Sequence, residues 1–454
     1  AGARAVSSHP GTLAGSKAAY TAAFRKAGVI EAATVQELFD FAEGFSRQPL
    51  PAGPGVAILT NAGGPAILAT DACERVGVRL ARLGTDTVEA LRDVLPAAAA
   101  LYNPVDVLGD ADAARYEMAA RILVRDPAVN SLLVVLTPQA MTQAEDTARA
   151  VAAVASDAGV TTLAVFMGDR SVAAAVRALK DAGIAAYSFP EQAVATLGAM
   201  ERHAAQRMRA PDPPMGVPAD YHIVRAAIDH AREAGRTFIT EESAGRIARA
   251  YGLPVPGSGL ARDRTEAQVL AGRIGYPVVL KIASPDILHK TDIGGIALDI
   301  VDAAALDVAY ERMMSSVRHR MPDAHVWGVT VQRQLPPGHE VIVGVHRDPS
   351  FGPVLMFGLG GVYVEVLKDV AFRLCPVTPT EARSMIEEIR GYGVLRGARG
   401  AAPADIDSIV DAICRVSALA IDFPEVTELD INPLIVGRRG DGAFAADIRI
   451  GIGG

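Results

Sequence analysis

A lysine, a glycine-containing loop and a distant set of acidic side chains are the features of this sequence best suited to chemistry. Lys281 lies in the apolar run VVLKI (278–282), where a lysine either extends to solvent or meets an anion. The loop that follows, ASPDILHKTDIGG (283–295), ends in paired glycines, and free backbone N–H groups in such loops can cover phosphates. The combination favours a phosphate-binding site.

Acidic and amide side chains alternate along a stretch much later in the chain. The sequence ELDINPL (428–434) contains Asp430 and Asn432, and AFAADIRI (443–450) adds Asp447 on what reads as a neighbouring strand. Alternate residues of a strand point to one face, so these three side chains could converge on Mg²⁺, which prefers oxygen ligands. Taken alone, each acidic residue is better explained as a solvated side chain at the edge of a sheet than as a metal ligand. Lysine, loop and acids in this order together favour a metal–phosphate site.

Two further stretches carry weaker signals. The turn after an apolar run at 55–60 has Asn61, Gly63 and Gly64 opening a predicted helix that runs to about Gly77. The first-turn N–H groups and the helix dipole make an anion site there, although tight turns between strand and helix use glycine in any case. His9 lies in SSHPGTLAGS (7–16), and this stretch alone reads as a flexible, solvated terminus.

The secondary-structure elements that must position these residues follow two different sequence patterns. A helix is predicted over 16–27, with Ser16 as its N-cap and Gly28 as its stop. Residues 52–200 alternate alanine-rich helices with short continuous apolar strands, which is typical of a parallel sheet covered on both faces. Those strands are predicted at 55–60, 131–137, 161–166 and 185–189.

Residues 222–454 follow a proline-rich linker at 201–221 and read differently. A helix is expected near 241–251, and the later strands are longer with alternating polarity, which indicates antiparallel sheets and an α+β domain. These strands are predicted at 276–282, 294–300, 328–335, 339–348 and 353–361.

Bulk properties narrow the class of protein. The 454 residues carry a formal net charge of −8, which argues against a nucleic-acid or anionic-membrane partner. The three cysteines form no C-x-x-C pair, so neither a disulfide framework nor a zinc site is indicated, and a cytoplasmic location is expected. No apolar run is long enough to span a bilayer. The chain lacks an initiator methionine, which suggests processing or truncation.

The later region resembles the ATP-grasp domain of the NDP-forming (ADP-forming) acyl-CoA synthetases, relatives of succinyl-CoA synthetase. The matching stretches are YPVVLKIASPDILHKTDIGG, GHEVIVGVHRDPSFGPVLMFGLGGVYVEVLKD and ELDINPL. The resemblance implies that Lys281 contacts the nucleotide phosphates, that Asn432 and Asp447 hold Mg²⁺, and that His289 is a transiently phosphorylated loop histidine. It also implies nucleotide contacts from Gln332, Arg333, Gln334, Glu340 and Glu365.

The earlier region resembles the flavodoxin-like ligase domain of the same superfamily, on AILTNAGGPAILATDA (57–72) and YNPVDVLG (102–109). The opening stretch resembles the family's phosphohistidine loop, usually S-H-T-G-S-L-A-G, with Pro10 and Thr12 as departures that leave its backbone hydrogen bonding open. This resemblance implies that His9 is the central phosphoryl carrier. It further implies that the helix N-terminus at Asn61, Gly63 and Gly64 holds its phosphate.

The expected architecture is therefore a remnant of a first ligase domain (1–50), a flavodoxin-like CoA-ligase domain (52–200), a linker (201–221) and an ATP-grasp domain (222–454). The reaction implied is acid + CoA + ATP ⇌ acyl-CoA + ADP + phosphate, with Mg²⁺ as cofactor and acyl phosphate and phosphohistidine as intermediates. An imidazole is nucleophilic near neutral pH and can pass the phosphoryl group between the sites.

Members of this family normally begin with a Rossmann-type CoA-binding domain, and no G-x-G-x-x-G unit precedes His9. We therefore expect a missing CoA-binding domain or subunit, and a homo-oligomer. The main alternative is the regulatory acyl-CoA-synthetase-like module of a protein lysine acetyltransferase. The retained His9 and a C-terminus without room for an added domain favour the synthetase. A third reading, an ATP-grasp ligase that needs no phosphohistidine, leaves both histidine loops unexplained.

Overall fold

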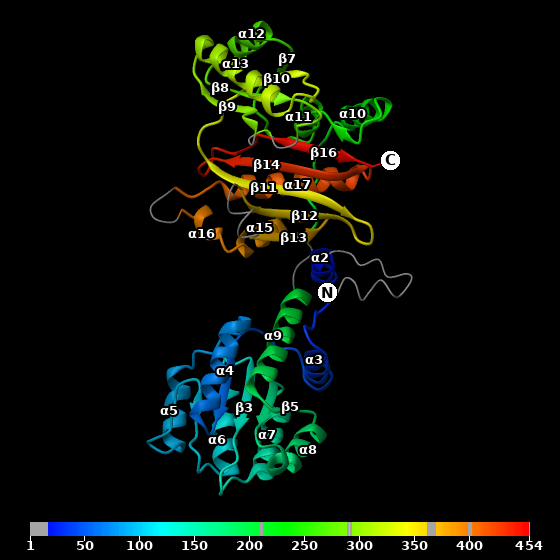
Figure 1. The fold of residues 1–454 in the computed structure, drawn as a ribbon. Coiled ribbons are helices and arrows are strands. Elements are labelled where there is room, and N and C mark those ends of the chain that lie inside the picture. The colour runs from blue at the N-terminus through cyan, green and yellow to red at the C-terminus, as the bar shows by residue number, and fades with distance from the viewer. Residues whose placement is uncertain are drawn as a thin grey trace. The chain divides into compact units, whose positions relative to one another are not determined.

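The computed structural model describes residues 17–208, 212–287, 290, 293–360, 369–397 and 402–453. The chain forms two compact units, shown as ribbons in Figure 1. We call Gly28–Ala210 the parallel-sheet unit, and Ala1–Ala27 together with Pro211–Gly454 the two-sheet unit. None of the helices built from these described residues has the length and apolar character needed to cross a membrane.

The parallel-sheet unit is built on five parallel strands in the order β2-β1-β3-β4-β5, the order of flavodoxin-like folds. Every residue of β1, β3 and β4 is buried, because helices cover both faces, and the predicted parallel sheet is confirmed. The strands are β1 (Val56–Thr60), β2 (Val105–Asp106), β3 (Ser131–Leu136), β4 (Thr161–Phe166) and β5 (Ala185–Tyr187).

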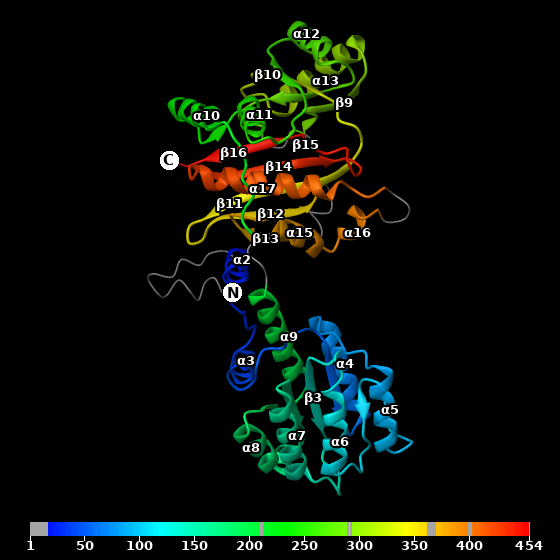
Figure 2. The ribbon, with the colours of Figure 1, turned by 180° about the vertical axis from the view of Figure 1, so that it is seen from behind.

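Two apolar cores lie on opposite faces of this sheet. Helices α4 (Gly63–Val76) and α9 (Pro190–Arg207) pack on one face through side chains such as Cys73 and Leu197. The other face is covered by α5 (Thr85–Val94), α6 (Ala113–Leu123), α7 (Ala144–Ala158) and α8 (Ala173–Asp181), and a short 3₁₀ turn, η2 (Asp169–Val172), precedes α8. The two helical layers can be followed in Figure 2.

The N-terminal segment of this unit packs with the parallel sheet. Helix α3 (Val35–Arg47) falls in the stretch predicted as a separate remnant, yet it packs on α9 and β5. Tyr187 Oη donates to the Asp40 carbonyl at 3.0 Å, and Gln192 Nε2 donates to the Asp40 carboxylate at 3.0 Å. The two compact units divide between residues 27 and 28. At the other end α9 continues to Arg207, so the first residues of the predicted linker are helical.

The two-sheet unit contains a four-stranded antiparallel sheet in the order β7-β10-β8-β9. Its strands are β7 (Ser258–Ala261), β8 (Val278–Ala283), β9 (Ile296–Ile300) and β10 (Gly328–Arg333), and α12 (Arg264–Ile274) and α13 (Ala303–Arg320) contribute to its core. The antiparallel pairing predicted from alternating polarity is confirmed.

The second sheet of this unit runs β13-β12-β11-β14-β16-β6, with β15 paired to β14, and it is also antiparallel. Its strands are β6 (Phe238–Ile239), β11 (His339–Asp348), β12 (Gly352–Leu359), β13 (Val370–Leu374), β14 (Val426–Val436), β15 (Ala443–Ala445) and β16 (Ile448–Ile452). Helices in the same unit are α10 (Tyr221–Glu233), α11 (Glu241–Ala250), α15 (Pro379–Glu388), α16 (Tyr392–Leu395) and α17 (Ile406–Asp422).

Helix α2 (Lys17–Ala27) belongs to the two-sheet unit, where it packs on β13. Ala19 and Ala22 form a small buried cluster with Val354, and the ring of Tyr20 meets that of Phe351 edge-on at 4.8 Å. The predicted helix over 16–27 is thus confirmed from residue 17 onward, and its proposed cap, Ser16, lies outside the described residues.

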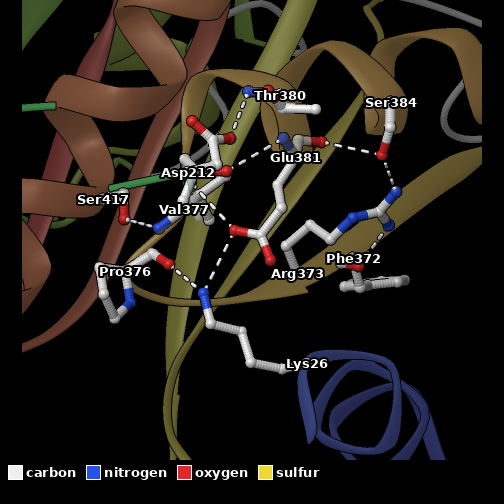
Figure 3. Close-up of polar contacts among 11 residues, drawn as sticks. Lys26, Asp212, Phe372, Arg373, Pro376, Val377, Thr380, Glu381, Ser384 and Ser417 are labelled. Atoms are coloured by element: carbon white, nitrogen blue, oxygen red, sulfur yellow. Dashed lines mark hydrogen bonds and ion pairs between the residues drawn. The ribbon is translucent and has the colours of Figure 1, made fainter. Parts of the chain in front are cut away.

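Polar contacts extend this docking at the C-terminal end of α2, as Figure 3 shows for Lys26. The Lys26 ammonium donates to the Pro376 carbonyl and pairs with the Glu381 carboxylate at 3.2 Å. Arg25 pairs with Glu388 at 2.5 Å. Helix α2 is therefore held by both apolar packing and ion pairs.

Candidate functional site

A cleft of about 1100 Å³ opens in the two-sheet unit. Its walls come from the start of α11, from β7, from the end of β8 and the residues after it, from the start of β10, and from β14 and β16. Glu241, Lys290, Thr330, Asp430 and Asp447 are among the lining residues that matter below. Both sheets of the unit thus contribute to one concave surface.

Strand alternation places Lys281 and Gln332 on the same face of the four-stranded sheet. Lys281 on β8 lies opposite Thr330 on β10, and Gln332 lies opposite Val279. The intervening residues, such as Leu280, point into the core and are fully buried. Because alternate side chains face opposite sides of a sheet, the lysine and the glutamine project toward the second sheet of the unit.

Both side chains meet one carbonyl in the bend between β15 and β16, where Asp447 also lies and not on a strand as expected. Lys281 Nζ donates to the Ala446 carbonyl at 2.7 Å, and Gln332 Nε2 donates to the same oxygen at 3.0 Å. Ala446 directly precedes Asp447, one of the predicted metal ligands. The structure therefore brings the predicted phosphate-binding lysine beside the predicted metal site, across 165 residues of sequence.

The two predicted metal ligands are neighbours. The Asn432 N–H donates to the Asp447 carbonyl at 3.1 Å, and alternate residues of β14 face outward as predicted, with Glu428 and Asn432 exposed and Asp430 half-buried. Burial raises the pKa of the Asp430 carboxyl, Arg449 opposes that rise, and the carboxylates of Asp447 and Glu428 add to it.

The donor chemistry of this pair fits a hard cation. Among the described residues no cluster of three His, Cys, Asp or Glu side chains is arranged to hold a metal. Mg²⁺ is nevertheless usually bound through one or two protein oxygens together with substrate phosphates and waters. The Asn432 amide and the Asp447 carboxylate supply oxygens of that kind, and Asp447 follows the residue whose carbonyl Lys281 contacts. Asp447 lines the cleft, whereas Asn432 is not among the described residues that line it.

The remaining predicted nucleotide residues are more scattered. Arg333 is exposed at the end of β10. Gln334 follows it, donating to the Asp299 carboxylate at 2.6 Å and accepting the Asp299 N–H at 2.7 Å. Glu340 is exposed on β11, and its carbonyl accepts the Gly360 N–H at 2.7 Å. None of these three residues is among the described residues that line the cleft, and neither are Lys281 and Gln332.

Three predicted site residues cannot be placed. His9, His289 and Glu365 lie outside the described residues. Lys290, which follows His289 in the sequence, is described and lines the cleft.

The predicted anion site of the parallel-sheet unit has two parts with different roles. The Asn61 side chain holds two strands together, whereas the N-terminus of α4 is open. Asn61 Nδ2 donates to the Thr137 carbonyl at 2.9 Å, and Asn61 Oδ1 accepts the Thr137 N–H at 2.9 Å and its hydroxyl at 3.1 Å. The Asn61 amide thus fastens the end of β1 to the end of β3, which are the two strands at the switch point of the sheet.

Helix α4 begins just after this fastening and has no side-chain cap. A Cβ added to Gly64 would meet nothing within 4 Å, and one on Gly63 would come no closer than 3.9 Å, to Asp106. The helix N-terminus at the predicted position is therefore accessible, with first-turn N–H groups that suit an anion.

Sequence reasoning missed Glu241. Its carboxylate pairs with Lys290 at 2.7 Å and lies 3.7 Å from Lys281. In the sequence Glu241 reads as an ordinary acid in the first turn of a helix, and nothing local relates it to either lysine. Only the packing of α11 beside the four-stranded sheet brings the three side chains together.

Comparison with known proteins adds three family matches. An ATP-grasp domain model matches residues 230–452, a Ligase-CoA domain model matches residues 56–211, and a model of the succinyl-CoA ligase like flavodoxin domain matches residues 1–45. Lys281 and the cleft lined by Asp447 fall in the first match, and the N-terminus of α4 falls in the second.

Curated relatives match over most of the chain. Acetate–CoA ligase [ADP-forming] I of Archaeoglobus fulgidus is 44% identical over 439 residues, which is 96% of this chain and 62% of the relative. The 4-hydroxybutyrate–CoA ligase [ADP-forming] of Nitrosopumilus maritimus is 37% identical over 99% of this chain and 64% of its own length. The chain thus spans less than two thirds of these two proteins.

A shorter relative is covered almost completely. The beta subunit of acetate–CoA ligase [ADP-forming] I of Pyrococcus furiosus is 46% identical over 226 residues, which is 50% of this chain and 96% of that subunit.

Proposed function

Because the chain belongs to the family of ADP-forming acyl-CoA ligases, we propose that it works in the reaction acid + CoA + ATP ⇌ acyl-CoA + ADP + phosphate. The observation that carries the proposal is the convergence of Lys281 and Gln332 on the carbonyl beside Asp447. The relatives reported above are named as ligases, which favours this function over the regulatory module of a lysine acetyltransferase.

The two-sheet unit is proposed to bind ATP in its cleft. The Lys281 ammonium neutralises phosphate oxygens, and the Asn432 amide and the Asp447 carboxylate hold Mg²⁺. When bound, Mg²⁺ neutralises further phosphate charge, which eases attack on phosphorus. The His289 imidazole then attacks the γ-phosphorus, a P–N bond forms, the P–O bond to ADP breaks, and ADP leaves.

The parallel-sheet unit is proposed to take part in the second half of the reaction. The phosphoryl group passes to the substrate carboxylate, with His9 as carrier and the N-terminus of α4 at Gly63 and Gly64 binding its oxygens. A P–N bond breaks as the P–O bond of an acyl phosphate forms. The CoA thiolate then attacks the acyl carbon and phosphate leaves. The relatives act on acetate and 4-hydroxybutyrate, so short aliphatic acids are the first substrates to test.

Phosphoryl transfer to protein tests the proposal directly. With [γ-³²P]ATP and Mg²⁺, the full chain should acquire label that is acid-labile and base-stable. Lys281→Met should slow labelling by about 10²-fold or more, the loss typical for one preorganised charge contact in a transition state. Lys180→Met is the control, because that lysine pairs with Glu43 in the other unit.

The histidines assign the steps. His289→Ala should abolish the label, whereas His9→Ala should retain labelling from ATP but block acyl-CoA formation. Unchanged labelling of the Lys281→Met or His289→Ala protein would contradict the proposed nucleotide site.

A further inference from the structure

One carboxylate at the wall of the cleft pairs with two lysines. Glu241 Oε2 lies 2.7 Å from Lys290 Nζ, and Glu241 Oε1 lies 3.7 Å from Lys281 Nζ. The three residues come from the first turn of α11, from the connection between β8 and β9, and from β8 itself. The carboxylate therefore ties three separate segments of the chain.

Burial makes this bridge significant for the lysines. The Lys281 and Lys290 side chains are only 7% and 12% exposed, against 28% for Glu241. A poorly hydrated ammonium needs a partner. Lys281 also has the Ala446 carbonyl, whereas the Lys290 ammonium meets only Glu241 among the residues that the structure describes.

The main chain of Lys290 is held as well. Its carbonyl accepts the Gly295 N–H at 2.7 Å. A Cβ on Gly295 would lie 2.9 Å from that carbonyl oxygen and 2.6 Å from a methyl carbon of Ile282, so only glycine permits this approach. Lys290 is thus fixed to the sheet through its backbone and to α11 through its side chain.

The charges of the bridge act in two opposed ways. Glu241 fixes Lys290, the residue next to His289 in the sequence, beside the lysine proposed to bind phosphate. Its negative charge at 3.7 Å from Lys281 also opposes an incoming polyphosphate. The same carboxylate therefore disfavours nucleotide binding while it holds the Lys290 side chain in place.

We propose that Glu241 is a positioning residue for phosphoryl transfer, acting through Lys290 and Lys281. The inference rests on the proposed function, because it concerns the transfer from ATP to the protein. It predicts that nucleotide affinity and transfer rate change in opposite directions when the charge is removed. A carboxylate with a merely structural role would lower both together.

The test measures both quantities on the full chain. Glu241→Gln keeps the shape of the side chain and removes its charge. Binding of Mg-ADP by calorimetry should tighten about 3- to 10-fold, equivalent to about 1 kcal/mol of relieved repulsion. Single-turnover labelling by [γ-³²P]ATP should slow by about 10-fold or more, as expected when an accepting group is misplaced.

Two further variants sharpen the result. Glu387→Gln removes an exposed carboxylate of α15 in the same unit, and Glu387 is not among the described residues that line the cleft, so both measurements should stay within about 2-fold of wild type. Lys290→Gln removes the other partner of the bridge. It should slow labelling like Glu241→Gln but without tighter Mg-ADP binding.

The outcomes separate the inference from the function beneath it. If the wild-type protein is labelled and Glu241→Gln is labelled at the same rate, the positioning role is wrong and the proposed function stands. Slower labelling with weaker Mg-ADP binding would make Glu241 a structural residue. A wild-type protein that binds Mg-ADP but takes up no label would overturn the proposed function and the inference together.

Discussion

The ion network beneath α2 offers a quantitative test of how this protein holds a buried charge. Arg373 on β13 has a side chain only 5% exposed, and its guanidinium donates to the Glu388 carboxylate at 2.8 Å. Arg25 of α2 meets the same carboxylate at 2.5 Å. Burial lowers the pKa of Arg373, and the hydrogen bond to Glu388 works against that effect. The perturbation is Glu388→Ala.

The expected cost follows from what Arg373 keeps. It retains bonds to the Phe372 carbonyl and the Ser384 hydroxyl, each 2.9 Å (Figure 3), but it loses the carboxylate that it pairs with. The charge of Arg25 then opposes that of Arg373, and the more weakly acting Glu381 carboxylate favours it. Removing one partner of a fully buried ion pair costs about 3–5 kcal/mol. Because Glu388 is itself 41% exposed, water can reach the guanidinium, and we expect about 2–3 kcal/mol.

Tryptophan fluorescence during urea unfolding provides the assay. Trp327 is the single tryptophan of the chain and lies in the two-sheet unit, so its signal follows that unit and not the other. With a denaturant slope of about 2–3 kcal/mol per molar urea, the midpoint should fall by about 1 M. Arg25→Ala leaves the buried pair intact and should cost less than about 1 kcal/mol.

A neighbour on the same helix supplies the control. Glu387 is exposed in the last turn of α15, so Glu387→Ala should change stability by less than about 0.5 kcal/mol. If Glu388→Ala is no more destabilising than Glu387→Ala, the carbonyl and hydroxyl partners alone satisfy Arg373, and the reasoning fails.

The network also has a pH signature. Burial alone would raise the pKa of Glu388, but hydrogen bonds from Arg25 and Arg373 outweigh it and lower the value. A lowered folded-state pKa adds stability above the unfolded carboxyl pKa, about 4.3, and this stability is lost as the pH falls through the folded value. The advantage of wild type over Glu388→Gln should therefore shrink below about pH 4.

Two other predictions concern the parallel sheet and the thiols. Burial raises the pKa of Cys73, Cys375 and Cys414 to about 11. A disulfide reagent at pH 8 should therefore modify the native protein about 100-fold more slowly than the urea-unfolded chain. Equal rates would show that the thiols are accessible. Asn61→Ala removes the hydrogen bonds between the ends of β1 and β3. It should destabilise the parallel-sheet unit by about 2–3 kcal/mol in circular-dichroism melts and leave the Trp327 transition unchanged. A shift in both transitions would contradict a local role for Asn61.

The strands could be predicted because each signal is local. Continuous apolar runs such as 131–137 indicated buried parallel strands, and alternation along 428–434 placed Asp430 and Asn432 on one face, as the structure has them. A polar or charged partner for Lys281 could be predicted because burying an unpaired ammonium among apolar side chains is costly.

The identity of each partner could not be read from the sequence. The carbonyl that receives Lys281 is 165 residues away, and the Thr137 groups that occupy Asn61 are 76 residues away. Asn61 therefore looked like part of a phosphate site although its side chain secures the sheet. The position of α3 on α9 was missed for the same reason, because contacts between distant segments depend on tertiary packing.

The small helix α2 has a consequence for how the chain can be divided. The polypeptide leaves the two-sheet unit after Ala27 and re-enters it at Pro211, so the parallel-sheet unit is an insertion within the other. If the chain were cut between residues 208 and 212, the N-terminal fragment would still contact the C-terminal fragment through α2. Residues 17–27 would remain seated on β13 through Arg25 and Lys26, and an intramolecular contact would become a subunit interface. We therefore expect the two fragments to associate through the 11 residues of α2.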